Sequence, residues 1–371
     1  MPEPRHKSSL PIGCMAPLNI EEAALKLEAS LAVSDEAWFR PIPTGFVDFD
    51  RLMGGGLHSG DLHLLGGPQN IGKTSMTLQM ATEVAAHGAL ALVINYEHSV
   101  DTLWERLLCQ SAFADRGKAL LTAELLNDAY IATVRERDSV PDDGEGMKLR
   151  YLDRVLGRVP AGLTAWSRLS LAGQNIWLVT GHGVYTTVDA IGHYVDFAFS
   201  LADRVVLIVD YVQEVPVISL ERPLEANERI ERALAGLKNL ALNLKNEGRV
   251  LSVIAVAAAD GEGLRRGRVH LENLWGNATI QYKPDVAWIG NRDESGPDGV
   301  PVIRWAVEKN RRGPSDLEFR YAYHGEAYAF ELDGVPVPPN QSWQPERNAL
   351  MSRVAGIVSR DGTGRELNSA T

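Results

Sequence analysis

The stretch LHLLGGPQNIGKTS, residues 62–75, decides the fold of this 371-residue chain. Its apolar start, Leu62–Leu65, predicts a buried strand, and Ser75–His87, ended by Gly88, predicts a helix. The pattern G-x-x-x-x-G-K-[ST] between them is matched by Gly67, Gly72, Lys73 and Thr74. Because a strand precedes the pattern and a helix follows it, a chance match is disfavoured. The stretch therefore predicts a strand, a glycine-rich loop and a helix in succession.

The residue types in this loop suit phosphate. Glycines let successive backbone N–H groups turn toward phosphate oxygens, and Lys73 supplies a positive charge to them. The Thr74 hydroxyl is a ligand for Mg²⁺ at the positive end of a helix. We therefore expect ATP and Mg²⁺ as cofactors, held by Gly67, Pro68, Gln69, Asn70, Ile71, Gly72, Lys73, Thr74 and Ser75.

Strand-like and helical segments alternate along the rest of the core. A helix is predicted at about 226–246, where the apolar residues keep one face. Strands are predicted at Leu90–Asn95, Ile176–Val179, Val205–Val209, Val250–Ala255, Val286–Ile289 and Val302–Val307. This alternation predicts the α/β class, with a doubly wound and mostly parallel sheet.

Composition shifts divide the chain into three parts. Residues 1–40 combine a proline-containing arm with one amphipathic helix, which either packs on its own domain or docks on a neighbouring subunit. Residues 41–333 form the predicted domain, with a helical insertion at about 115–165. Residues 334–371 read as a proline-rich linker and a tail, and 348–371 suggest the start of a helix-turn-helix module.

Overall composition bounds the function. The formal net charge is −11, which argues against a surface coated in positive charge for wrapping nucleic acid. Two cysteines without metal-ligand spacing, no secretory signal and no apolar run long enough to span a bilayer predict a cytoplasmic protein without membrane partners.

Three polar residues follow predicted strands. Asp210 ends the run RVVLIVD and is predicted to hold Mg²⁺ together with Thr74, while Gln213 could sense the terminal phosphate. Glu97 follows the strand Leu90–Asn95, where a carboxylate could orient and deprotonate an attacking water. The alternatives are an ordinary strand-end aspartate and a surface-loop glutamate.

Two cations stand late in the chain. In the segment EKNRRGP, residues 308–314, Lys309 and Arg311 point to the same side of an extended strand. Their strand can lie far from the glycine-rich loop of its own chain, so we interpret them as cations that reach the ATP of a neighbour. The alternative is a solvated basic turn.

Taken together, these motifs resemble the ATPase domain of DnaB-like replicative helicases from about Pro43 to Glu331. The resemblance rests on TGFVDFDRLMGGGLHSGDLHLLGG at 44–67, the loop at 67–74, NYEHS at 95–99, LIVDYVQ at 207–213 and KNRRGP at 309–314. It implies a RecA-like P-loop NTPase core that forms a hexameric ring and threads single-stranded DNA. It also implies that the helix at 19–32 grips the next subunit.

The resemblance assigns a role to each candidate. Lys73 and Thr74 match the phosphate and magnesium residues, and Glu97 matches the catalytic glutamate. Asp210 matches the second acidic residue and Gln213 a residue that couples hydrolysis to movement. Lys309 and Arg311 match the cations that act in trans.

Two features bear on DNA. Where the family carries a serine–glutamine pair, this chain reads Val256-Ala257-Ala258-Ala259, which offers no side-chain hydrogen bond. Candidate DNA contacts are Arg265, Arg266 and Arg268, in the position of a channel loop, although a solvated loop is the alternative.

Two functions therefore remain open. The first is a ring-forming, ATP-dependent DNA helicase or single-strand translocase. The second is a DnaB- or KaiC-like ATPase whose ring assembly serves as a switch or scaffold without translocation.

Overall fold

The structure, a computed structural model, describes residues 17–33, 36–114, 119–136, 150–219, 222–265, 267–275, 279–296, 299–315 and 317–342. The chain divides into two compact units, Met1–Arg40 and Pro41–Thr371. The predicted arm at the N-terminus, the loop at 139–146 and the predicted module at 348–371 lie wholly or mostly outside the described residues.

The described part of the first unit contains one long helix. Helix α1, Ile20–Val33, begins at a reciprocal cap: Asn19 Oδ1 accepts from Glu22 N at 2.9 Å, and Asn19 N donates to Glu22 Oε2 at 2.8 Å. Asn19 and Glu22 thus satisfy each other's backbone N–H groups at the start of the helix. No residue of α1 is buried, and Ile20, Leu27 and Leu31 are each more than half exposed. A short helix, α2, follows at Glu36–Phe39.

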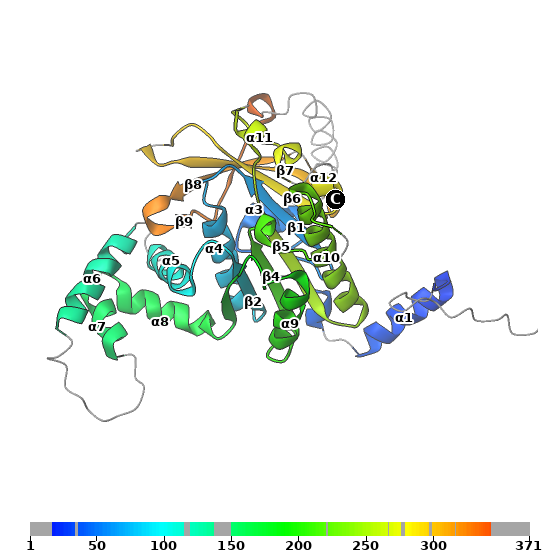
Figure 1. Ribbon diagram of the computed structural model, residues 1–371, viewed down its shortest axis with the longest axis horizontal. Coiled ribbons are helices and arrows are strands. Elements are labelled where there is room, and N and C mark those ends of the chain that lie inside the picture. Colours follow the sequence, from blue (N-terminus) through cyan, green and yellow to red (C-terminus); the bar gives the residue numbers. More distant parts are fainter. Residues whose placement is uncertain are drawn as a thin grey trace, which may run out of the picture. The chain divides into compact units, whose positions relative to one another are not determined.

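A ten-stranded sheet runs through the described part of the second unit (Figure 1). Its order is β10-β8-β7-β6-β1-β5-β4-β2-β3, with β9 paired to β8. The strands from β6 to β3 are parallel, and those beyond β6 are antiparallel. The bounds are β1 Leu62–Gly67, β2 Leu90–Asn95, β3 Ile176–Thr180, β4 Arg204–Asp210, β5 Val250–Ala258, β6 Val286–Arg292, β7 Val302–Asn310, β8 Glu318–His324, β9 Ala329–Phe330 and β10 Val335–Pro336.

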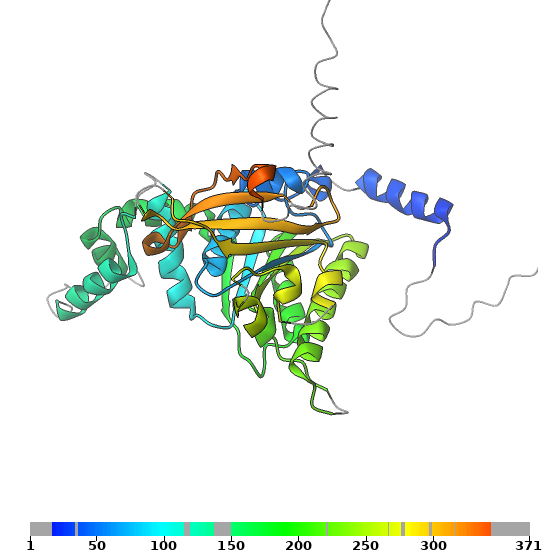
Figure 2. The ribbon, with the colours of Figure 1, turned by 90° about the horizontal axis from the view of Figure 1, so that it is seen from above.

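Helices cover both faces of the parallel strands (Figures 1 and 2). Helices α4, α5 and α8 pack on one face, and α9 and α10 pack on the other. Each central strand is buried on both faces, which explains its nearly continuous apolar sequence. The α/β class with a doubly wound, mostly parallel sheet is confirmed. The helices in this unit are α3 Val47–Leu52, α4 Lys73–Ala86, α5 Val100–Phe113, α6 Ala123–Arg135, α7 Arg150–Arg158, α8 Gly162–Gly173, α9 Val188–Phe199, α10 Ala226–Asn246, α11 Gly261–Arg265 and α12 Thr279–Tyr282.

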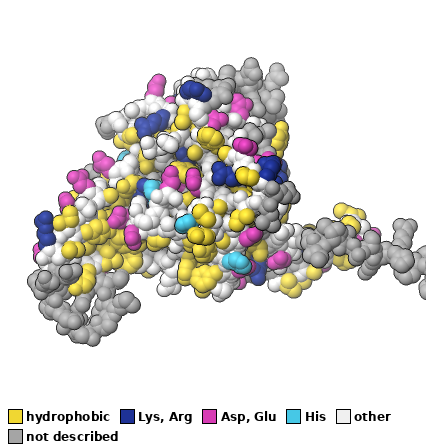
Figure 3. Space-filling model, in the orientation of Figure 1, with side chains coloured by type: hydrophobic (Ala, Val, Ile, Leu, Met, Phe, Trp, Pro, Cys, Tyr) yellow, Lys and Arg dark blue, Asp and Glu magenta, His cyan; other side chains and the backbone are white. Residues whose placement is uncertain are grey.

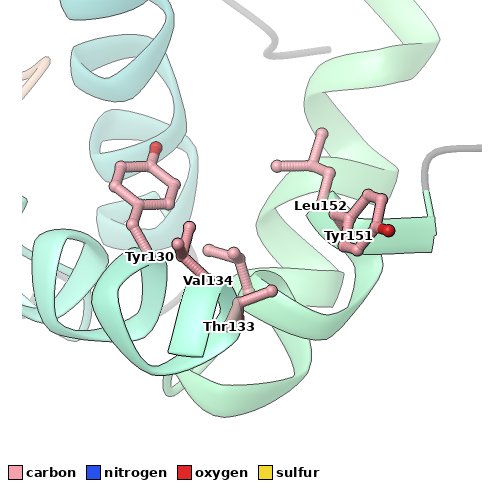
Figure 4. A pocket seen from close by; sticks show the side chains of 6 residues that line it. Tyr130, Thr133, Val134, Tyr151 and Leu152 are labelled. Atoms are coloured by element: carbon pink, nitrogen blue, oxygen red, sulfur yellow. The ribbon is translucent and has the colours of Figure 1, made fainter. Parts of the chain in front are cut away.

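The segment predicted as a helical insertion contains α6, α7 and the start of α8. An apolar pocket of about 460 Å³ lies between α6 and α7, and side chains from both helices face it (Figure 4). Figure 3 shows hydrophobic side chains exposed over this part of the surface. The exposed hydrophobic residues of α6 and α8 include Ile131, Val134, Leu163 and Leu171. This pocket is formed by the insertion and lies apart from the glycine-rich loop.

The sheet continues past the predicted domain boundary at residue 333. Val335 and Pro336 form β10 and pair with β8, and the Gln341 carbonyl accepts a hydrogen bond from Arg304 Nη1 at 3.1 Å. The linker predicted from residue 334 is therefore wrong for its first residues. Proline, which lacks an N–H, is tolerated here because β10 is an edge strand.

Among the described residues, no helix has both the length and the apolar character needed to cross a membrane.

Candidate nucleotide-binding site

The glycine-rich loop joins the end of β1 to the start of α4, at the carboxyl edge of the parallel strands. Gly67 has φ +149° and Gly72 has φ +84°, a region that favours glycine. A Cβ at Gly72 would lie 2.8 Å from the rings of Tyr323 and Phe330. Close packing and backbone conformation therefore both require glycine at position 72. The rest of the predicted loop, Pro68, Gln69, Asn70 and Ile71, lies between these glycines, and Ser75 follows in α4.

Lys73 is the first residue of α4 and is buried. Its Nζ donates to the carbonyls of Pro68 at 2.6 Å and Gly67 at 3.0 Å. Burial lowers the pKa of Lys73 to about 8, while the carboxylates of Asp210 and Glu97 oppose that shift. The ammonium group is thus held inside the loop where a phosphate would lie.

Asp210 ends β4 and meets the first turn of α4. Its Oδ2 accepts from the Thr74 hydroxyl at 2.6 Å and from Asn95 Nδ2 at 2.9 Å. Burial raises the pKa of Asp210 to about 6, and the Thr74 hydrogen bond and the Lys73 charge act against this rise. Its Oδ1 is buried and has no hydrogen-bond partner among the described residues.

These groups fit a magnesium ion. Mg²⁺ takes oxygen ligands and commonly uses one carboxylate, retained waters and phosphate oxygens. Thr74 and Asp210 supply a hydroxyl and a carboxylate in contact, and the free Oδ1 needs a polar partner. The two metal residues predicted from the sequence are therefore brought together by the fold.

Glu97 lies two residues beyond the end of β2, at the same edge of the sheet. Its N–H donates to Asn95 Oδ1 at 2.9 Å, and its side chain is 47% exposed. The Glu97 carboxylate lies near Tyr211 and, with Asp210, adds to the rise in the pKa of Tyr211 that burial chiefly causes. An exposed carboxylate near Lys73 and Asp210 can contact a water, as the predicted catalytic role requires.

Gln213 lies in a short 3₁₀ turn, Val212–Glu214, directly after β4. Its Nε2 donates to the Ala258 carbonyl at 3.4 Å, and its Oε1 is buried without a partner among the described residues. Gln213 therefore faces the end of β5 instead of Lys73. Its predicted role in sensing phosphate stays a prediction.

Lys309 and Arg311 lie at the opposite edge of the sheet from the glycine-rich loop. Lys309 Nζ donates to the carbonyls of Gln281 and Tyr282 at 2.7 and 2.8 Å. Arg311 forms an ion pair with Asp285 at 3.1 Å, and the Asp285 backbone pairs with Leu62 at the start of β1. Strand β1 separates them from the loop by about 17 Å, at about 3.3 Å per residue.

The three arginines predicted to contact DNA do not form one exposed group. Arg265 is exposed at the end of α11, and Arg266 lies outside the described residues. Arg268 is largely buried and forms an ion pair with Glu318 at 3.4 Å. Their role in DNA binding stays a prediction.

Sequence reasoning missed several polar residues at the carboxyl edge of the sheet, near the glycine-rich loop. Arg106 on α5 lies over the Tyr328 ring, and its charge lowers the pKa of Asp210. Arg292, at the end of β6, donates to the Asn70 carbonyl at 3.3 Å. Tyr323 shares a hydrogen bond with Ser75 at 3.1 Å. Asn95 could have been found from the sequence, because it is a polar residue at the end of the apolar strand β2, as Asp210 is at the end of the adjacent β4.

Comparisons with known proteins agree with this geometry. Residues 41–142 match the model of the DnaB-like helicase C terminal domain family. The DNA repair protein RadA of Mycolicibacterium smegmatis is 28% identical over 173 residues, which cover 42% of this chain and 36% of RadA. The matched part of the chain thus spans about a third of this relative.

Two solved structures share the fold. One, described as an ATPase domain, has a TM-score of 0.60 at 18% identity, covering 85% of this chain and 99% of that chain. The other is a DnaB-like replicative helicase, described with its interactions with primase. It has a TM-score of 0.61 at 19% identity, covering 84% of this chain and 68% of that chain. The predicted resemblance is therefore confirmed: residues 41–142 match the DnaB-like helicase C terminal domain family, and the chain has the RecA-like fold of these ATPase domains.

Proposed function

We propose that this chain is an ATPase that assembles into a ring of identical subunits, hydrolyses ATP between them and moves along single-stranded DNA. The observation that carries the proposal is the 2.6 Å hydrogen bond from Thr74 to Asp210. It joins the phosphate loop to the acidic end of β4 at the edge where Glu97 also lies.

Each residue has a separate task in hydrolysis. Backbone N–H groups of residues 67–74 and the Lys73 ammonium bind and orient the phosphates. Thr74 and Asp210 would hold Mg²⁺, which when bound neutralises charge on the phosphates. Glu97 orients the attacking water and accepts its proton.

The second half of the site comes from the next subunit in this proposal. Lys309 and Arg311 lie at the edge of the sheet away from the loop of their own chain, so they cannot serve the ATP bound there. A head-to-tail ring places the carboxyl edge of one subunit against the opposite edge of the next. Arg311 then stabilises negative charge on the phosphate transferred in the neighbouring site.

One observation favours a ring that does not translocate. Arg268 is engaged by Glu318, and the last two residues of β5 and the residue after it are alanines, Ala257, Ala258 and Ala259. These residues offer few groups that bind a DNA backbone or relay the state of the phosphate. A switch or scaffold ATPase is therefore the second candidate.

One measurement separates the two. Steady-state ATP hydrolysis is followed with and without single-stranded DNA, on a sample whose mass is determined by light scattering. A translocase shows hydrolysis that DNA stimulates and a mass of several subunits, whereas the switch ATPase hydrolyses at a rate that DNA does not change.

Lys73→Ala is the reference variant for this measurement. It removes a charge that orients and neutralises the phosphates, so hydrolysis should fall by roughly a hundredfold or more. Hydrolysis that survives this substitution would show that the activity arises elsewhere.

A further inference from the structure

Asn95 connects the two carboxylates of the proposed site. It ends β2 directly opposite Asp210 on β4 and is fully buried. Its Nδ2 donates to Asp210 Oδ2 at 2.9 Å, while its Oδ1 accepts from the N–H groups of Glu97 and His98 at 2.9 and 2.7 Å. One amide group therefore touches the carboxylate of Asp210 and the backbone of the turn that carries Glu97.

The hydrogen-bond partners define the orientation of this amide. Two backbone N–H groups require an acceptor, and a carboxylate oxygen requires a donor. A reversed amide would face oxygen with oxygen and N–H with N–H, leaving buried groups unpaired. The side chain thus has one orientation that satisfies all its partners.

Fixing Asp210 has a consequence for its second oxygen. Oδ2 receives both the Thr74 hydroxyl and the Asn95 amide, so the carboxylate cannot rotate without losing two hydrogen bonds. Oδ1 is left buried and without a partner among the described residues. Asn95 therefore determines which oxygen of Asp210 is available for binding.

We infer that Asn95 is a positioning residue that aligns Asp210 for Mg²⁺ and Glu97 for water through one buried amide. The inference rests on the proposed function for the role of Glu97, while the role of Asp210 concerns metal binding alone. No step of hydrolysis passes through Asn95 itself. Its removal should weaken metal-dependent binding and slow turnover without disturbing the phosphate loop.

The chain offers a matched control. Asn291 on β6 is also buried at this edge, and its amide spans the N–H and the carbonyl of Val269 at 2.7 and 2.8 Å. It holds a loop by the same chemistry but contacts neither Asp210 nor Glu97. Asn291→Ala therefore removes a comparable buried amide without touching the two carboxylates.

The test measures the affinity for a non-hydrolysable ATP analogue by calorimetry, with EDTA and with Mg²⁺. In Asn95→Ala, affinity with EDTA should stay within about threefold, while the gain on adding Mg²⁺ should fall roughly 10–100-fold, as for other residues that orient metal ligands. The value of kcat should fall in the same range, and KM for ATP measured with Mg²⁺ should rise as the Mg²⁺-dependent affinity falls. Asn291→Ala should keep the Mg²⁺-dependent gain and the wild-type relation of kcat to KM.

A second variant guards against misfolding. Asn95→Ser keeps a polar side chain, but this side chain is too short to bridge Asp210 and the turn. It should therefore lose the Mg²⁺-dependent gain in affinity as Asn95→Ala does, while it destabilises the fold less. The inference is overturned if either Asn95 variant folds and keeps the wild-type gain, or if Asn291→Ala loses as much. A wild-type protein that shows the Mg²⁺-dependent gain but no turnover would refute the proposed hydrolysis, while the binding comparison still decides the role of Asn95.

Discussion

His63 lies inside β1 with 3% of its surface exposed, and neither ring nitrogen has a hydrogen-bond partner among the described residues. Burial lowers its pKa from 6.5 to about 4, although the carboxylates of Asp61 and Asp285 act in the opposite direction. The native state therefore holds His63 neutral, whereas the unfolded chain protonates it below about pH 6.5. Stability is lost as pH falls from about 6.5 to 4.

The size of this loss can be measured. At about 1.4 kcal/mol for each pKa unit, the shift corresponds to about 3 kcal/mol of unfolding free energy between neutral pH and pH 4. His63→Leu should remove that part of the acid sensitivity, as judged by urea unfolding between pH 7.5 and 4.5. His87→Leu, at a half-exposed histidine, should keep the wild-type slope. An equal slope in wild type and His63→Leu would contradict the assignment.

At the residue scale, the sequence predicted the functional residues that lie close together within one motif. Gly67, Gly72, Lys73 and Thr74 lie within eight positions, so their spacing alone indicates phosphate chemistry. Arg106 and Tyr323 reach the same edge from α5 and β8, and that meeting depends on tertiary packing. Nothing local distinguishes such residues from an ordinary surface arginine or core tyrosine.

At the scale of elements, helix α1 exposes one apolar stripe. Ile20, Leu27 and Leu31 share a face, and none is buried in a structure of the single chain. In the proposed ring, this face packs on a neighbouring subunit, where burial of the exposed half of each leucine contributes about 1 kcal/mol.

Charge on this stripe should therefore weaken assembly. Leu27→Glu combined with Leu31→Glu should shift the light-scattering mass toward a single subunit at micromolar concentration. Leu25→Glu makes the same change at another exposed leucine on the opposite face of α1 and should leave the mass unchanged. Equal effects of the two changes would contradict a specific interface. The fold of the core, as judged by circular dichroism, should be the same in all three proteins, because residues 1–40 form a separate unit.

The parallel strands could be predicted from the sequence, whereas the short antiparallel strands near the C-terminal end of the described chain could not. Runs such as LALVIN at 90–95 and RVVLIVD at 204–210 are continuous apolar segments, as buried parallel strands require. Strand β8 mixes buried and partly buried positions, and β10 has two residues that include a proline. Such strands are defined by their neighbours in the sheet, and at β10 composition alone suggested a linker.

At the scale of the whole molecule, one chain separates the two halves of its own candidate site. The glycine-rich loop follows the end of β1, whereas Lys309 and Arg311 lie beside its start. Asp285 holds this second group in place, because it accepts hydrogen bonds from Lys238, Leu62 and Arg311. We expected this separation from the sequence, but we did not predict the anchoring by Asp285, whose partners come from three distant parts of the chain.

This separation makes the trans role of Arg311 testable. Arg311→Ala should bind ATP normally and lose hydrolysis roughly 10³-fold or more, because it removes transition-state charge stabilisation in the neighbouring site. Glu97→Gln should also bind ATP and fail to hydrolyse it. In a ring mixed from equal amounts of the two, about a quarter of the interfaces would pair an intact Glu97 with an intact Arg311. Hydrolysis should therefore reappear on mixing, whereas each variant alone stays inactive.

Arg312→Ala is the matched control for this experiment. Arg312 is the next residue along, but its guanidinium is bound by Asp61 of the same chain at 2.7 and 2.8 Å. Arg312→Ala should lower the stability of the chain, because it removes this ion pair. When it is mixed with Glu97→Gln, the ATPase activity should be no higher than the activity expected from the two proteins measured separately. If the Arg311→Ala and Glu97→Gln mixture is as inactive as its components in rings shown to exchange subunits, Arg311 acts within its own chain. Its ion pair with Asp285 would then be a structural contact, and the neighbour would have to supply the missing charge from another residue.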